Sequence, residues 1–477
     1  MTSRLTLRVS LAAFAAACAT NPATGGHMLA LVSESQEIAM GKEADPAIAA
    51  QMGLVDDSGL QAYVAGLGAR VAAVGERPHL PWTFRVVDDP IINAFALPGG
   101  FIYVSRGILA HFNSEAELVA VLGHEVGHVT ARHSVSQMSK QQLAQVGLAV
   151  TSIAAPKLAQ YSSLAGQGLG LMFLKFGRDD ETQSDALGLR YMRRLQYDVR
   201  QMAGVYTMLG RVSAASGGEA IPSWLSTHPA PADREQRINA AVAAIPPDSL
   251  GTTVRREEYL RRINGLVYGE NPRHGYFKAT QFYHPDLKFQ LAFPAGWQTY
   301  NTQQAAGAVS AKKDAMLELS GSGRGSAPDS AARAFFGNQA VQGTPARVQI
   351  NGLPAVAGPF TATTQDGVLQ GYAAFVSHEG IVFRLLGYAT QASWSGNAAA
   401  VETAIKSFAR LTDPKILAVQ PHRVEVVRLD RDMTVAEFLQ RYPAPVPAAT
   451  VALLNNVDVN GTIKRPAGKR IVGAPLP

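Results

Sequence analysis

The chain of 477 residues contains a single cysteine, Cys18, so no framework of disulfide bonds can hold it together. It also lacks an uninterrupted run of about 20 apolar residues, the length that a membrane-spanning helix needs. Charged residues make up only 17% of the sequence, and the formal net charge is +6. No cluster of Lys and Arg is interleaved with aromatic residues, so we expect no nucleic-acid partner. Stability must come from hydrophobic cores, and the length allows two or three domains.

The first residues have the composition of an export signal. Arg4 and Arg8 precede the apolar stretch 11–17, which is too short to span a bilayer, and no acidic residue interrupts them. Cys18 follows, and this order resembles a bacterial lipoprotein signal in which the cysteine becomes lipidated. An ordinary secretory signal followed by a free cysteine is the alternative. Ala19 resembles the residue found in lipoproteins sent to the outer membrane, so we expect a periplasmic protein anchored through Cys18.

The most informative stretch of the sequence is 124–128, His-Glu-Val-Gly-His. Apolar residues recur at helical spacing over 118–129, which predicts a buried, amphipathic helix around it. Ser114 lies three residues before Glu117, a spacing typical of the capping box that begins a helix.

Two histidines on one helix face are a common metal-binding arrangement. Positions four apart lie about 40° apart around a helix, so His124 and His128 point the same way and can hold one Zn²⁺. Glu125 lies beside them, placed to take a proton from an attacking water. Two core histidines with a chance glutamate between them are the alternative interpretation.

A catalytic zinc also needs a third protein ligand and an open position for water. His133 is close in sequence, but nine residues after His124 correspond to about 180° around a helix, so we predict a solvated or second-face residue. Glu181 and Asp185 lie four apart on another predicted helix. Glu181 would complete a His₂Glu set, and Asp185 could accept the free N–H of a ligand imidazole. Without a zinc helix beside it, such an acidic pair is usually a solvated helix face.

These residues make the chain resemble the gluzincin proteases of the CAAX-prenyl-protease and HtpX superfamily, in its periplasmic lipoprotein branch. The resemblance covers about residues 19–240 and rests on segments 31–41 and 93–104, the zinc helix, the Glu181 helix, and Ser226–Pro229 followed by Arg234. It implies zinc-dependent endoproteolysis with one Zn²⁺ per chain. It also implies that His228 lies near the metal, where it stabilises the oxyanion or holds the site closed. Gly177 and Glu235 depart from the usual pattern without touching the metal ligands.

In gluzincins a strand above the zinc helix presents its edge to an extended substrate backbone. Segment 94–104 predicts a strand, a glycine turn and a second strand, and the candidate substrate strand is Ala94, Phe95, Ala96 and Leu97. A plain structural hairpin is the alternative. Recognition along a strand suits extended chains, so the expected substrates are unfolded or misassembled envelope proteins.

Segment 141–174 is apolar, but Pro156 and several polar residues interrupt it. We expect a pair of buried or lid-forming helices over the active site, with a membrane-dipping loop as the alternative. Residues 271–415 contain strand-like segments and a helix over about 397–411, which predicts an α+β domain without a catalytic set. His284 and His378 in this domain are expected to be structural.

The last segment, 420–477, has the order strand, helix, helix, glycine turn and strand, which is similar to a LysM-type module. Modules of this type bind peptidoglycan sugars, and a LysM-like fold without glycan binding is equally open. The sequence therefore predicts an α+β protein with a mainly helical gluzincin domain and a small sheet, an α+β domain, and a LysM-like module. The expected boundaries are signal peptide 1–17, tether 18–30, protease 31–270, α+β domain 271–415 and LysM-like module 420–477.

A zinc endopeptidase is the function that the sequence favours. Two alternatives remain: a proteolytically silent assembly factor or chaperone of the outer membrane, and a binding protein tethered to peptidoglycan.

Overall fold

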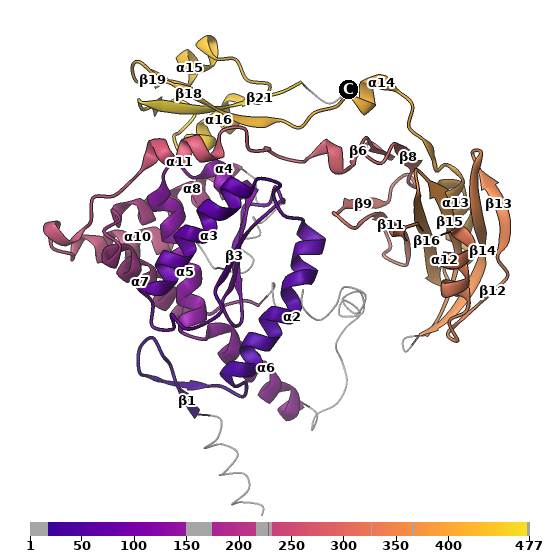
Figure 1. Cartoon of the computed structure of the whole chain (residues 1–477), viewed down its shortest axis with the longest axis horizontal. Helices are drawn as coiled ribbons and strands as arrows, with labels where there is room; N and C mark the ends of the chain where they lie inside the picture. Colours follow the sequence, from indigo (N-terminus) through magenta and orange to yellow (C-terminus); the bar gives the residue numbers. More distant parts are fainter. Residues whose placement is uncertain are drawn as a thin grey trace, which may run out of the picture. The chain divides into compact units, whose positions relative to one another are not determined.

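The computed structural model describes residues 18–148, 174–215, 228, 231–325, 327–364 and 367–474. The chain divides into two compact units, each of which is described by itself. Unit 1 combines the residues up to Gly269 with Arg423–Val472, and unit 2 combines Glu270–His422 with the residues after Val472. Both units contain helices and strands (Figure 1), so the predicted α+β class is confirmed.

Unit 1 is mainly helical. Its helices are α2 (Glu34–Met52), α3 (Ser58–Ala73), α4 (Arg106–His111), α5 (Glu115–Thr130), α6 (His133–Leu148), α7 (Arg178–Arg194), α8 (Arg200–Ala215), α10 (Pro231–Ala243), α11 (Arg256–Ile263), α15 (Val435–Arg441) and α16 (Ala448–Leu454). Its strands are β1 (Cys18–Thr20), β2 (His27–Leu29), β3 (Thr83–Val87), β4 (Ala94–Leu97), β5 (Phe101–Ser105), β18 (Arg423–Arg428), β19 (Met433–Thr434), β20 (Thr462–Ile463) and β21 (Ala467–Val472).

Helix α5, which carries the HEVGH stretch, lies at the centre of unit 1 (Figure 1), and every one of its residues is buried. Apolar side chains of α3, α7 and α8 pack around it in one hydrophobic core. The burial is therefore more complete than an amphipathic pattern predicts, because helices cover α5 on several sides.

A small three-stranded sheet in the order β3-β5-β4 packs beside α5. Strand β3 is parallel to β5, and β4 is antiparallel to β5. Gly99 and Gly100 form the turn between β4 and β5 with φ of 83° and 102°. A side chain strains the backbone in that left-handed region, so glycine suits both positions. The predicted strand, glycine turn and strand are present.

The segment expected to be a tether has regular structure in unit 1. Residues Cys18–Thr20 pair with His27–Leu29 as an antiparallel hairpin. The backbone N–H of Leu31 donates to Ser139 Oγ of α6 at 2.9 Å, and Asn21 Nδ2 donates to Gln183 Oε1 of α7 at 3.1 Å. Thr, Asn, Pro and Gly are also the residues of tight turns, which explains why composition alone suggests a tether.

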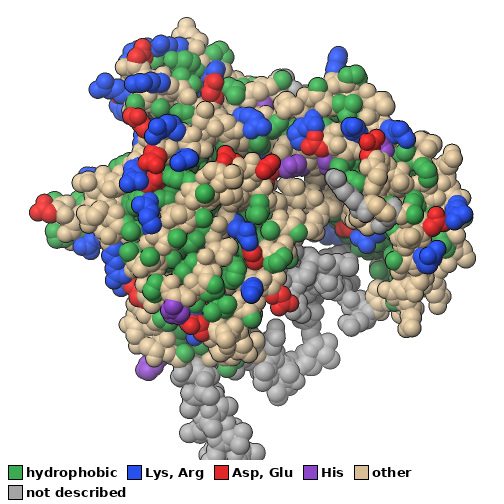
Figure 2. All heavy atoms as spheres, in the orientation of Figure 1, with side chains coloured by type: hydrophobic (Ala, Val, Ile, Leu, Met, Phe, Trp, Pro, Cys, Tyr) green, Lys and Arg blue, Asp and Glu red, His purple; other side chains and the backbone are tan. Residues whose placement is uncertain are grey.

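The C-terminal segment 423–472 belongs to unit 1 instead of forming a separate module. Strands β18 and β21 pair antiparallel, and α15 and α16 lie between them in sequence. Val424, Leu454 and Ile471 join the same hydrophobic core as α5. Figure 2 shows basic and acidic side chains interspersed over this segment, and pairs such as Lys464–Asp432 (2.9 Å) and Arg441–Asp430 (3.0 Å) join them.

A buried lysine attaches this segment to the helices that lead into the metal site. Lys469 Nζ donates to the backbone oxygens of Ala110 (2.8 Å), in the last turn of α4, and Phe112 (2.7 Å), just after it, and its side chain is fully buried. Burial lowers the pKa of Lys469 well below its ordinary value, and the charge of buried Glu117 opposes that change. The last strand of unit 1 is therefore part of the support of α5.

Unit 2 is built on an eight-stranded sheet and a four-stranded sheet. Its elements are η4 (Pro272–His274), β6 (Tyr276–Lys278), β7 (Gln281–His284), β8 (Phe289–Ala292), β9 (Gln298–Asn301), β10 (Ala305–Val309), β11 (Ala315–Arg324), α12 (Pro328–Phe336), β12 (Val341–Gly343), β13 (Ala346–Ile350), β14 (Leu353–Thr364), β15 (Gly367–His378), β16 (Ile381–Thr390), α13 (Trp394–Lys406), β17 (Ala409–Arg410) and α14 (Pro414–Leu417). The predicted α+β character of 271–415 agrees with this architecture.

Within the described residues, no helix has the length and apolar character needed to cross a membrane. The lid helices expected over 141–174 fall largely on 149–173, and the expected signal on 1–17; both lie outside the described residues.

Candidate metal centre

Helix α5 begins and ends at positions that local sequence specifies. The Ser114 hydroxyl accepts from the Glu117 N–H at 3.2 Å, as the capping prediction requires. The Glu117 carboxylate accepts instead from the Asn113 N–H at 2.6 Å, one residue before the cap. At the other end α5 stops at Thr130, and Arg132 adopts a φ of 58° that turns the chain into α6.

Glycines let α7 approach α5 closely enough to bring its acidic side chains to the histidines. A Cβ on Gly123 would lie 3.1 Å from Gly188 Cα, and one on Gly127 would lie 3.2 Å from Ser184 Cα. Both separations are tighter than ordinary contacts of a side chain, so larger residues would push the helices apart.

Four buried side chains converge between the two helices: His124, His128, Glu181 and His228, with ligand atoms within 4.8 Å of one another. The Nε2 atoms of His124 and His128 are 2.9 Å apart. His228 Nδ1 lies 2.8 Å from Glu181 Oε1 and 3.4 Å from His124 Nε2. Glu181 Oε1 is 3.4 Å from His128 Nε2. The structure therefore brings together the three predicted ligands and His228.

The spacing of these atoms fits a zinc ion. Ligand atoms about 2.0–2.1 Å from a tetrahedral zinc lie roughly 3.3 Å apart, and the separations among His124 Nε2, His128 Nε2 and the Glu181 oxygens include 2.9, 3.4 and 3.6 Å. Nitrogen and carboxylate oxygen are also donors that zinc accepts. The set could hold one metal ion.

Glu125 has an unusual environment for a carboxylate. It is fully buried, and neither of its carboxylate oxygens has a hydrogen-bond partner in the part of the chain that the structure describes. Burial raises the pKa of Glu125 to about 7. Its Oε1 lies 3.9 Å from His228 Nε2, so it borders the four-residue cluster. A buried carboxylate without protein partners is costly unless it faces water or another ligand, which is the position that a general base needs.

Asp185 lies where the sequence predicts it, beside the ring of His124. Its Oδ1 lies 3.0 Å from His124 Nδ1, the ring nitrogen that faces away from the cluster. Arg234 binds Asp185 with two nitrogens at 2.6 and 3.0 Å and Glu181 Oε2 with a third at 2.6 Å. Tyr206 donates to Asp185 at 2.5 Å, and the Arg234 guanidinium lies over its ring.

The electrostatics of the cluster follow from these contacts. Burial opposes the ionisation of Glu181, but the neighbouring His228 and His128 outweigh it and hold the pKa of Glu181 well below its ordinary value. Burial and the Arg234 charge lower the pKa of His124 to about 3. Ionised Glu181 and neutral His124 are thus in the protonation states that metal ligands require.

The prediction that His133 is solvated or on a second face is wrong. Its side chain is buried, and its Nδ1 lies 3.0 Å from His128 Nδ1. The error came from projecting one continuous helix, whereas α5 ends before His133 and α6 begins at it. Arg234, Tyr206 and Gln183 also support the site, and no local motif in the sequence indicates their partners.

Strand β4, the candidate substrate strand, lies at one edge of its sheet as expected. Its side chains are buried rather than exposed, with Ala96 the most accessible at 8%. Only the backbone edge of this strand could therefore pair with an incoming chain. Cys18 begins β1, and the structure does not describe its side chain.

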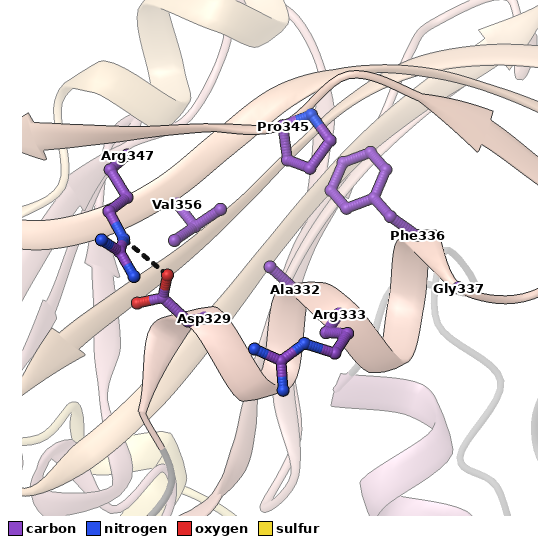
Figure 3. A pocket seen from close by; sticks show the side chains of 8 residues that line it. All are labelled: Asp329, Ala332, Arg333, Phe336, Gly337, Pro345, Arg347 and Val356. Atoms are coloured by element: carbon purple, nitrogen blue, oxygen red, sulfur yellow. Dashed lines mark hydrogen bonds and ion pairs between the residues drawn. The ribbon is translucent and has the colours of Figure 1, made fainter.

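A hollow on unit 2 has a different character (Figure 3). Its lining is mainly apolar, with Ala332, Phe336 and Val356, and an ion pair of 2.6 Å joins Arg347 to Asp329 at its rim. Metal-ligating histidines and a nucleophile are absent from the described residues that line it. This hollow offers no chemistry comparable to that of unit 1.

Comparison with known proteins agrees with the geometry of unit 1. The mitochondrial metalloendopeptidase OMA1 of Arabidopsis thaliana is 36% identical over 171 residues, which are 36% of this chain and 33% of that protein. The OMA1 of Schizosaccharomyces pombe is 35% identical over 184 residues, 37% of this chain and 51% of that protein. The beta-barrel assembly-enhancing protease of Escherichia coli is 29% identical over 241 residues, 48% of this chain and 49% of that protein. The chain thus spans about a third to a half of the length of these relatives.

The sequence model of Peptidase family M48 matches residues 58–242. This region contains α5, α7 and all four members of the buried cluster. The match and the geometry agree, and residues 58–242 therefore form a domain of Peptidase family M48.

Proposed function

We propose that the chain is a zinc-dependent endopeptidase of the bacterial cell envelope that hydrolyses peptide bonds in misfolded or unassembled envelope proteins. The observation that carries the proposal is the buried cluster of His124, His128, Glu181 and His228, with the buried carboxylate of Glu125 beside it, which accepts no hydrogen bond from the described residues. A zinc ion held there would supply a Lewis acid and would acidify a water molecule. Two relatives are named metalloendopeptidase and beta-barrel assembly-enhancing protease, and these names support the reaction and the setting.

Each residue has a distinct task in this proposal. His124, His128 and Glu181 hold the ion, and Asp185 orients His124 through its Nδ1. Glu125 removes a proton from the attacking water and passes it to the leaving amine. The substrate backbone lies along the edge of β4, and His228 stabilises the oxyanion.

The test is cleavage of an unfolded casein by the purified full-length protein. We expect peptide release that stops when a chelator removes the metal and resumes when zinc is added back. A protein that binds zinc but releases no peptide would overturn the proposal.

A proteolytically silent assembly factor is the second candidate, and the position of His228 favours it. Its Nδ1 lies 2.8 Å from Glu181 and 3.4 Å from His124, where it would take the coordination position that water needs. Replacing His228 with Ala separates the roles. Cleavage should rise if His228 closes the site at rest, and it should fall if His228 stabilises the oxyanion.

The remaining proposals concern attachment. Lipidation of Cys18 would place the protein at the outer membrane, and Cys18→Ser should then move it from the membrane fraction to the periplasmic fraction. The order β18, α15, α16, β21 supports a LysM-like fold for 420–477, and peptidoglycan binding is the activity that we propose for that fold. Sedimentation of the full chain with insoluble peptidoglycan tests this, with soluble glycan fragments as the competitor. Retention that the competitor does not reduce would contradict glycan recognition.

A further inference from the structure

The two histidines of α5 have different partners on the sides that face away from the cluster. His124 Nδ1 lies 3.0 Å from the carboxylate of Asp185, whereas His128 Nδ1 lies 3.0 Å from the imidazole of His133. A metal-binding imidazole uses one nitrogen for the ion and donates the N–H of the other. Because the Nε2 atoms face the cluster, each Nδ1 carries the proton.

This requirement sets the tautomer of His133. Its Nδ1 must accept the hydrogen bond from His128, so its Nε2 carries the proton. That Nε2 lies 2.8 Å from Gln183 Oε1, an atom that can only accept. Asn21 Nδ2 donates to the same oxygen at 3.1 Å. One arrangement of protons therefore satisfies the contacts that lead from Asn21 through Gln183 and His133 to His128.

We propose that His133 is a positioning residue that holds His128 in the tautomer and orientation needed to bind the metal, with Gln183 and Asn21 holding His133 in turn. The inference rests on the proposed function in one respect, because it takes the four-residue cluster as a zinc site.

The contact between His128 and His133 is buried, which strengthens it. His128 and His133 are 1% and 4% exposed, so water has little access to replace either partner. Phe176 stacks on the His128 ring with centroids 4.0 Å apart, which fixes its plane from another side. Ser184 Oγ lies 3.3 Å from His133 Nδ1 and is the competing donor, but its contact is longer than that of His128.

The chain of contacts also explains what holds His133 in place. The left-handed residue Arg132 lies between α5 and α6, so His133 begins α6 and its Nδ1 faces His128 of α5. Gln183 and Ser184 come from α7, and Asn21 comes from the β1–β2 hairpin. A metal ligand is thus supported jointly by three elements outside its own helix.

The experiment measures zinc affinity of the full-length protein by competition with a chromogenic chelator, without any peptide substrate. His133→Phe keeps a buried ring but removes the acceptor, and we expect zinc binding to weaken about 10–100-fold. His133→Asn places an amide oxygen where Nδ1 lies, and it should restore most of the affinity. Gln183→Leu should weaken binding less than His133→Phe, and Asn21→Ala less again.

The matched control is His111→Phe, because His111 is also buried in unit 1 and its Nδ1 contacts Gly107 O of its own helix, away from the cluster. It should leave zinc affinity unchanged. Circular dichroism confirms that each variant is folded before titration. In the wild type, the His128 Nδ1 proton should also give a slowly exchanging NMR signal that His133→Phe removes and His133→Asn retains.

The outcomes separate this inference from the proposed function. A wild-type protein that fails to bind zinc overturns the proposed function. Zinc binding by the wild type that is equally tight in His133→Phe overturns the positioning role alone. Equal losses in His133→Phe and His133→Asn also overturn it, because packing rather than the acceptor atom would then be responsible.

Discussion

The two units of this chain bury different kinds of side chain. Unit 1 buries acids, bases and imidazoles, including Glu37, Arg77, Arg234 and Lys469 as well as the metal cluster. In the described residues of unit 2, the buried polar side chains are only Ser310 and His378. Its core consists instead of apolar side chains, with Phe289, Phe383 and Phe408 in mutual contact.

Burying a charge costs free energy unless a partner compensates it, and each partner must be placed accurately. Unit 1 meets this condition by pairing, as in the bidentate contact of Arg77 with Glu37 at 3.0 Å. Groups with strongly shifted pKa values are concentrated at functional sites, whereas an apolar core contributes to stability. The contrast indicates that activity and sensitivity to substitution are concentrated in unit 1.

The largest effect should come from Glu125→Gln. Glu125 is the general base in the proposed function, so casein cleavage should fall about 10²–10⁴-fold. Folding should change little, because no described residue loses a hydrogen bond when the carboxylate becomes an amide. Glu318→Gln in unit 2, where Glu318 accepts from Tyr300 at 3.2 Å, is the control and should cleave casein normally. Equal activity of both variants would contradict the role of Glu125.

Lys469→Met should destabilise unit 1 by about 2–6 kcal/mol, because it leaves two buried backbone oxygens without their hydrogen-bond donor. Hydrogen exchange measured by mass spectrometry should show faster exchange in α5 and unchanged exchange in β15. Lys464→Met removes the ion pair of an exposed lysine with Asp432, and solvent screening should make its effect on stability small. If Lys469→Met has an effect as small as that of Lys464→Met, the C-terminal segment does not support α5.

Metal removal should lower the stability of unit 1 alone. A ligand present at 100 times its dissociation constant contributes about 2.7 kcal/mol, and chelation withdraws that contribution. We expect α5 and α7 to lose exchange protection while β14 and β15 keep theirs. Equal loss of exchange protection in both units would show that the ion also stabilises unit 2. That result would contradict a metal site in unit 1 alone.

The smallest effect concerns pH and unit 2. Burial lowers the pKa of His284 to about 4, and its Nδ1 accepts from the Leu287 N–H at 3.2 Å. The unfolded chain binds a proton at His284 near pH 6.5 and the folded chain does not, so stability falls as pH drops from about 6.5 toward about 4. Between pH 6.5 and pH 5 the wild type should lose roughly 2 kcal/mol of unfolding free energy through His284, and His284→Phe should not show this loss. A pH profile of unit 2 unfolding that is the same in both proteins would contradict the prediction.

The sequence predicts three members of the buried cluster, His124, His128 and Glu181, because the signals for them are local. His124 and His128 share a helix face through a four-residue spacing, and Glu181 and Asp185 do the same on α7. Helical spacing and the cap at Ser114 also predict the element that carries the histidines. These features depend on neighbours along the chain, which a sequence displays directly.

Features that depend on long-range contacts were not predictable in the same way. His133 reaches His128 only because Arg132 turns the chain, and nothing about an arginine indicates a left-handed backbone. The assignment of 423–472 to unit 1 depends on contacts such as Asn113 Nδ2 with Leu454 O at 3.3 Å, far apart in sequence. The hairpin at 18–29 has the composition of a linker, and only its contacts to α6 and α7 show otherwise.

The contact of Lys469 with Ala110 and Phe112 also bears on the order of events during synthesis. The partners are 359 and 357 residues apart, so the ribosome makes α4 and α5 long before the strand that closes over them. At about 5–20 residues per second, that interval lasts roughly 20–70 s. During it the nascent chain has the histidines of α5 but not the finished core around them. The core around the histidines of α5 is therefore finished only after the strand that carries Lys469 has been made.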